Sequence, residues 1–191
     1  MKSFVKSALF AVVGLASVGA MAGEIRDTRV QASTAENKAF APNSTALQYI
    51  GVADGSGARI HQSTIAADSA VNHAHGNGSY ARQRVGYAEG NGHLHNVTVD
   101  ARNARNEAWA SGSKAYQGIG VALGNGEIRN TRVDARYATN YANGTNSVAV
   151  QEIGKVSGNS LIKDSTVVGT FAKNESLGAN SSAEQRIGVA K

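Results

Sequence analysis

After residue 22 the chain alternates small or β-branched residues with polar ones, in a pattern that returns every 34 or 35 residues. The aliphatic position of this pattern is filled in turn by Val30, Ile65, Val99, Val133 and Val167. Further small or β-branched side chains stand two residues to either side of it. A spacing of two residues is typical of a β-strand that buries one face. The pattern therefore predicts an opening strand in each of five repeats, which span residues 23–56, 57–91, 92–125, 126–159 and 160–191.

Two polar motifs follow the opening strand in every repeat. The first centres on an Asn that has Ala two residues before it: Asn37, Asn72, Asn106, Asn140 and Asn174. The second reads S-x-A-x-Q-x-[IV]-G. Its Ser positions are Ser44, Ser79, Ser113, Ser147 and Ser181; its Gln positions are Gln48, Gln83, Gln117, Gln151 and Gln185; its Gly positions are Gly51, Gly86, Gly120, Gly154 and Gly188. Dipeptides such as Gly90-Asn91 close the repeats with turn chemistry. Each repeat is therefore predicted to be two strand-rich arms joined by a turn.

Identical amides on the same face as Ala and Ile need an explanation, because a buried amide is costly unless it is hydrogen-bonded. In a stack of strands about 4.8 Å apart, each amide would lie above a copy of itself and could bond to it. The sequence thus predicts an all-β fold, a β-solenoid or cross-β stack of five strand–turn–strand repeats. The Asn, Gln, Ser and Gly columns would form its structural ladder. Helical repeats of similar length exist, but they bury large residues at helical spacing, whereas these columns lie two residues apart.

The first 22 residues have the pattern of a secretory signal peptide. Lys2 and Lys6 precede an apolar run, and Ala20-Met21-Ala22 offers the small residues that signal peptidase recognises. The apolar run is shorter than the about 20 residues of a membrane-spanning helix. We therefore expect cleavage after Ala22, no transmembrane segment after cleavage, and a bacterial protein that is secreted or held at the cell surface.

Composition narrows the class of protein further. Aromatic residues make up 6% of the chain, charged residues 17%, and Cys is absent. Few large apolar side chains are available to fill a thick core, and no thiol can act as a nucleophile or zinc ligand. The recurring Ser belongs to the repeat and not to a Ser/His/Asp arrangement. We expect neither an enzyme nor a cofactor.

A basic residue stands just before each opening strand and forms one column: Arg26, His61, His95, Arg129 and Lys163. Stacked at strand spacing, this column could attract an anionic matrix polysaccharide or extracellular DNA. The alternative is a solvated face whose charges are balanced by nearby Asp and Glu. Because aromatic residues are scarce and no stacking platform is evident, a dedicated nucleic-acid binder is not expected.

All five His lie in the second and third repeats, four of them in H-x-H pairs: His73 with His75, and His93 with His95. Such pairs place two imidazoles on one strand face, where zinc or copper could bridge them. Ligands of a repeat protein should recur, however, and the other repeats lack His. We therefore expect no metal site.

The combination of N-x-A with S-x-A-x-Q-x-[IV]-G resembles the repeats of curli-type and Fap-type bacterial functional amyloids. The resemblance covers the whole chain after residue 22. It implies an exported subunit of a Gram-negative bacterium that polymerises outside the cell into biofilm-matrix fibres. It also implies a repeat-bearing nucleator and an outer-membrane secretion pore as partners.

Two functions remain open on the sequence. The first is a self-assembling fibre subunit whose last repeat pairs with the first repeat of the next copy, because their columns match. The second is a β-solenoid adhesin or glycan-binding surface module that does not polymerise. Monomeric solenoids carry polar, atypical caps, whereas both terminal repeats here keep the repeat pattern, which favours the fibre.

Overall fold

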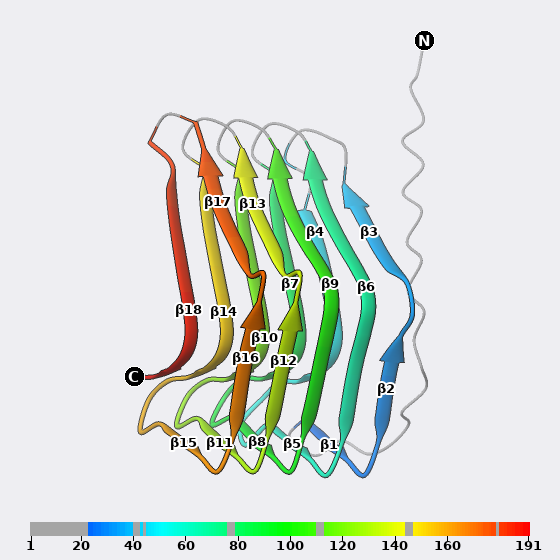
Figure 1. Cartoon of the computed structure of the whole chain (residues 1–191), viewed down its shortest axis with the longest axis vertical. Helices are drawn as coiled ribbons and strands as arrows, with labels where there is room; N and C mark the ends of the chain where they lie inside the picture. The colour runs from blue at the N-terminus through cyan, green and yellow to red at the C-terminus, as the bar shows by residue number, and fades with distance from the viewer. Residues whose placement is uncertain are drawn as a thin grey trace.

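The computed structural model describes residues 23–39, 43, 45–75, 79–109, 113–143, 147–178 and 180–191. Within these ranges the chain is all-β and winds into a stack of coils, one coil for each repeat. Figure 1 shows the coils side by side as successive bands of colour, with a row of short strands along the lower edge. The predicted signal peptide lies outside the described residues.

Every coil contributes strands to three parallel sheets. Sheet A holds the short strands β1 (Glu24–Arg26), β5 (Arg59–His61), β8 (His93–His95), β11 (Glu127–Arg129) and β15 (Leu161–Lys163). Sheet B holds β2 (Arg29–Ala32), β3 (Ala35–Ala39), β6 (Thr64–His75), β9 (Thr98–Trp109), β12 (Arg132–Arg136), β13 (Thr139–Asn143), β16 (Thr166–Thr170) and β17 (Lys173–Leu177). Sheet C holds β4 (Thr45–Ala53), β7 (Tyr80–Ala88), β10 (Lys114–Ala122), β14 (Val148–Val156) and β18 (Ser182–Ala190).

The strands pair in the register that the repeats predict. Asn106 lies opposite Asn140 in sheet B, and Gln117 lies opposite Gln151 in sheet C. The predicted β-solenoid is confirmed. The two predicted arms were an incomplete description, because sheet A forms a third face of each coil.

A residue with positive φ makes the corner between sheets A and B. This column comprises Asp27, Gln62, Asn96, Asn130 and Asp164, with φ between 46° and 55°. Asn and Asp adopt this left-handed conformation more readily than other non-Gly residues. Their backbone N–H groups donate to the next coil, as in Asn96 N–H to Arg129 O at 3.1 Å. The corner residue therefore ends the short strand, while backbone hydrogen bonds between neighbouring coils continue through it.

The interior is filled by one aliphatic position from each sheet. Fully buried members in the central coils are Ile60, Leu94 and Ile128 from sheet A, Ile65, Val99 and Val133 from sheet B, and Val85, Ile119 and Ile153 from sheet C. A separate cluster, where sheets B and C meet, consists of alanines: Ala46, Ala74, Ala81, Ala108, Ala115, Ala142 and Ala149. Small side chains allow two sheets to lie close together, which explains why so thin a core needs few large residues.

The Gly column turns sheet C at a point where no side chain fits. All five of its glycines have φ between 59° and 63°. A Cβ on Gly86 would lie 2.5 Å from Val99 Cγ2 of the next coil. Both the left-handed backbone and the lack of space therefore require Gly at this position.

Candidate functional site

The Asn column forms a continuous ladder of side-chain hydrogen bonds along sheet B. Asn37 Nδ2 donates to Asn72 Oδ1 at 3.0 Å, and each following Asn donates to the Asn of the next coil at 2.8 Å, up to Asn174. The same amide nitrogens cross to sheet C, as in Asn72 Nδ2 to Ala46 O at 3.1 Å. Each buried Asn therefore joins neighbouring coils and also joins two sheets.

The Gln column forms a second ladder, along sheet C. Gln83 Nε2 donates to Gln48 Oε1, Gln117 to Gln83, and Gln151 to Gln117, each at 2.7 Å; Gln185 donates to Gln151. Each Gln also donates across to sheet B, as in Gln117 Nε2 to Ala104 O at 2.9 Å. Both predicted amide ladders are confirmed by these contacts.

The two ladders run in opposite directions. Asn side chains donate toward the C-terminal coil, whereas Gln side chains donate toward the N-terminal coil. Each end of the stack therefore offers one unused acceptor. Among the described residues no donor reaches Asn37 Oδ1 in the first coil or Gln185 Oε1 in the last.

The last coil exposes surface that the other coils bury. Ile187 is 40% exposed, whereas Ile119 and Ile153 in the same column are fully buried. The nearest atom to a Cβ on Gly188 is 4.0 Å away, because no further coil follows within the described residues. The last coil therefore presents at this end the same surface that each inner coil packs against its neighbour.

The Ser column makes no ladder of its own. Ser79, Ser113 and Ser147 are buried, and their hydroxyls have no hydrogen-bond partner among the described residues. Ser44 lies outside the described residues, and Ser181 is half-buried in the last coil.

A different hydroxyl column bonds from coil to coil. Ser63, Thr131 and Ser165 accept a backbone N–H from the preceding coil, as in Thr131 N–H to Ser165 Oγ at 3.1 Å. The repeat pattern predicts small or β-branched residues at this position but not this hydrogen bond. Thr28 begins the same column, and among the described residues no N–H donates to its hydroxyl.

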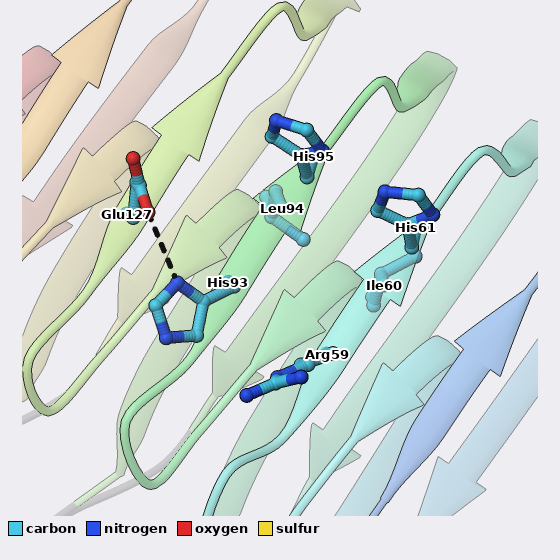
Figure 2. A pocket seen from close by; sticks show the side chains of 7 residues that line it. All are labelled: Arg59, Ile60, His61, His93, Leu94, His95 and Glu127. Atoms are coloured by element: carbon cyan, nitrogen blue, oxygen red, sulfur yellow. Dashed lines mark ion pairs between the residues drawn. The ribbon is translucent and has the colours of Figure 1, made fainter.

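The structure brings the predicted basic column together on sheet A. Arg26, His61, His95, Arg129 and Lys163 occupy successive positions of adjacent strands. Figure 2 shows His61 and His95 side by side on the outer face, where their rings stack 5.0 Å apart. The column is partly balanced by carboxylates, because Glu24 pairs with Arg26 and Glu127 pairs with Arg129.

His93 joins this balance from the neighbouring column, with Nδ1 3.3 Å from Glu127 Oε2. Burial raises the pKa of Glu127, but hydrogen bonds and charges from Arg129 and His93 outweigh burial and lower that pKa. Arg59, beside His93 in Figure 2, has no acidic partner among the described residues. Among the arginines of sheet A in the described residues, Arg26 and Arg129 are therefore ion-paired, whereas Arg59 is not.

The two H-x-H pairs do not come together. His73 lies on β6 of sheet B with Nδ1 2.8 Å from Glu107 Oε2, whereas His93 and His95 lie on β8 of sheet A. The side chain of His75 is outside the part of the chain that the structure describes. No group of three or more potential metal ligands is present among the described residues.

One surface of the folded chain was not predicted from the sequence. Four tyrosines and two arginines gather on the outer face of sheet C over the first three coils: Tyr49, Tyr80, Arg82, Arg84, Tyr87 and Tyr116. In-register pairing of sheet C brings these residues side by side, since Tyr116 lies opposite Arg82 and Tyr49 lies opposite Arg84. The rings contact arginines, and Tyr87 is only 6% exposed.

No protein-family model, curated protein or solved structure matches the chain. The resemblance to curli-type and Fap-type subunits therefore rests on the repeat columns alone. No helix of the described ranges is long and apolar enough to cross a membrane.

Proposed function

We propose that this chain is an exported structural subunit that assembles outside the cell into fibres by stacking coils end to end. The observation that carries the proposal is that each amide ladder ends in an unused acceptor, Asn37 Oδ1 in the first coil and Gln185 Oε1 in the last. The opposite end of each ladder carries the matching amide donor, so one copy complements the next without any change of register.

The junction between two copies repeats the contacts between two coils. Asn174 Nδ2 of one copy would donate to Asn37 Oδ1 of the next, as Asn140 donates to Asn174 within the chain. Gln48 Nε2 of the next copy would donate to Gln185 Oε1, as Gln185 itself donates to Gln151. Two partly exposed amide ends would thus become continuous buried ladders.

Backbone groups extend the same junction. Ser165 N–H of one copy would donate to Thr28 Oγ1 of the next, as Thr131 N–H donates to Ser165 Oγ. Asn37 Nδ2 of the next copy would donate to Ala183 O, as Asn174 donates to Ala149 O. The outer edge of β18 would pair with β4, the first strand of sheet C.

Such an interface joins two different surfaces and leaves a free end at each step. Contacts of this kind extend into a filament unless a rotation closes them into a ring. Unpaired strand edges favour the same outcome. The proposed route begins with removal of the signal peptide and export, with a repeat-bearing nucleator as the template for the first copy.

Negative-stain electron microscopy and sedimentation of the chain beginning at Gly23 test this function. We expect unbranched fibres with cross-strand spacing of about 4.8 Å along the fibre axis in diffraction. A protein that stays monomeric over a wide range of concentration would contradict assembly and favour the glycan-binding surface module.

A further inference from the structure

We infer that the outer face of sheet C carries a binding groove for an acidic glycan, a short stretch of uronate-bearing polysaccharide. The groove has a volume of about 300 Å³ and crosses the second to fifth coils. Four strands at their usual spacing span about 14 Å, the length of a short oligosaccharide. The inference goes beyond assembly, because a single copy contains the whole groove.

Gly118 makes room for an aromatic ring in the groove. It occupies the outward position of β10 that Arg84 fills on β7 and Glu152 fills on β14. The ring of Tyr87 packs into this space, since a Cβ on Gly118 would meet Tyr87 Cε2 at 2.8 Å, and Tyr87 is only 6% exposed. The buried ring therefore forms part of the groove lining at this point.

The arginines of the groove are held in place by aromatic rings. The Arg84 guanidinium lies 4.1 Å from the ring centre of Tyr87 and forms an ion pair with Glu89 at 2.7 Å. Arg84 is only 8% exposed. Arg82 lies 5.1 Å from the ring centre of Tyr80 and 6.0 Å from that of Tyr116. Arg82 has no carboxylate partner among the described residues, so its planar fork is available to a ligand carboxylate.

The far wall of the groove supplies acceptors. Glu152 accepts from Lys155 at 2.6 Å and from Arg186 at 2.8 Å, and Arg186 also pairs with Glu184. A sugar needs acceptors for its hydroxyl hydrogens as well as donors, together with an apolar ring face to stack on Tyr116. Single-stranded nucleic acid is bound by stacking and a positively charged groove, and it lacks the several hydroxyl donors per unit that a glycan offers to Glu152 and Glu184. The mixed wall therefore favours a glycan over a nucleic acid.

Isothermal titration with trigalacturonate tests the inference on the Ala183→Pro variant, which is designed to remain unassembled. We expect saturable binding, weakened at least about tenfold by Arg82→Ala and by Tyr116→Ala. Arg82→Lys should restore little affinity, because Lys lacks the planar fork. Tyr141→Ala removes a tyrosine that is partly buried like Tyr116, from β13 of sheet B, and serves as the matched control with unchanged affinity.

Two results would overturn the inference. One is the absence of trigalacturonate binding, or binding that Arg82→Ala and Tyr116→Ala leave unchanged. The other is binding of an oligothymidylate, and not of the glycan, with loss in the same variants, which would assign this face to nucleic acid. Because binding is measured on an unassembled variant, either result can be distinguished from a failure of the protein to form fibres.

Discussion

A Cβ on Gly120 would lie 2.4 Å from Cγ2 of Val133, which belongs to the following coil. The last member of the column, Gly188, keeps the same backbone with φ of 63°, but nothing fills the space beside it. The column position that would fill it is the one occupied by Val30 in the first coil. The pair Gly120 and Val133 therefore describes, inside one chain, the contact that we expect between two chains.

Gly188→Ala should impair assembly far more than it impairs folding. In the isolated chain the substitution costs only the left-handed backbone, about 1–2 kcal/mol. At the junction the new methyl group would occupy the place of Val30 of the next copy. Urea unfolding of the monomer, compared with the rate of fibre formation by sedimentation, separates the two effects.

Gly120→Ala is the matched comparison for Gly188→Ala. It adds a clash with Val133 to the same backbone cost, so we expect about 3 kcal/mol or more of lost stability in the monomer. Equal effects of both substitutions on stability, or fibre formation at an unchanged rate by Gly188→Ala, would contradict the proposed junction.

Ala183→Pro should stop fibre growth at a substoichiometric ratio. Ser182 N–H donates inward to Ser147 O at 3.2 Å, and successive N–H groups of a strand point to opposite sides. The N–H of Ala183 therefore points to the open edge, so Pro removes a bond that only the next copy would make. Seeded growth of the wild-type protein, followed with increasing variant, measures the effect.

Ser182→Pro is the control for the terminator. It removes the inward bond to Ser147 and should lower the stability of the monomer instead. Free incorporation of Ala183→Pro into growing fibres would show that β18 is not the growing edge.

Replacement of the central Gln residues should destabilise the fold less than additively. Gln117→Leu alone leaves Gln83 Oε1 buried without its donor, which costs about 1–3 kcal/mol beyond the lost bond. Combined replacement of Gln83, Gln117 and Gln151 by Leu removes both partners of the inner bonds. We expect its cost to be less than three times that of Gln117→Leu, and assembly to be slowed or blocked.

Urea unfolding of the single and triple variants measures this difference, with Lys114→Ala on the outer face of sheet C as the control. Fully additive losses would mean that the amides act separately and not as a ladder. Assembly of the triple variant at the wild-type rate would show that fibre formation does not require the Gln ladder.

Stability should fall on acidification partly through Glu107. Burial raises the pKa of this carboxyl, but hydrogen bonds from His73 and Arg105 outweigh burial, so the pKa lies below its usual value. Its stabilising contribution is therefore present above the usual carboxyl pKa of about 4.3 and is lost as the pH falls through the lower folded pKa.

The free energy of unfolding of Glu107→Gln should therefore be lower than that of the wild type near pH 5. This difference should shrink as the pH falls to about 3. Urea unfolding at several pH values tests this expectation. Tyr141→Phe, a change in the same column without a carboxylate, should shift stability by the same amount at every pH. A difference for Glu107→Gln that stays constant or widens in acid would contradict the assignment.

The repeat columns of the sequence were enough to predict the strand stack, its register and both amide ladders. In a parallel stack, each coil gives a column position the same surroundings, so the same requirement selects the same residue five times. Asn72 recurs as Asn106 because both bond to the coil above, and Gly86 recurs as Gly120 because both face a β-branched side chain. Such requirements can be read from a single chain because the chain repeats them.

The features that do not repeat could not be predicted from the sequence and are seen only in the folded chain. Whether an amide donates up or down the stack depends on the orientation of its side chain, and the letters Asn and Gln do not specify it. Sheet A became a separate face because the left-handed corner residues end its strands after three positions. The groove at Gly118 draws single residues from four coils, and outward positions are free to vary because water satisfies them equally well in every coil.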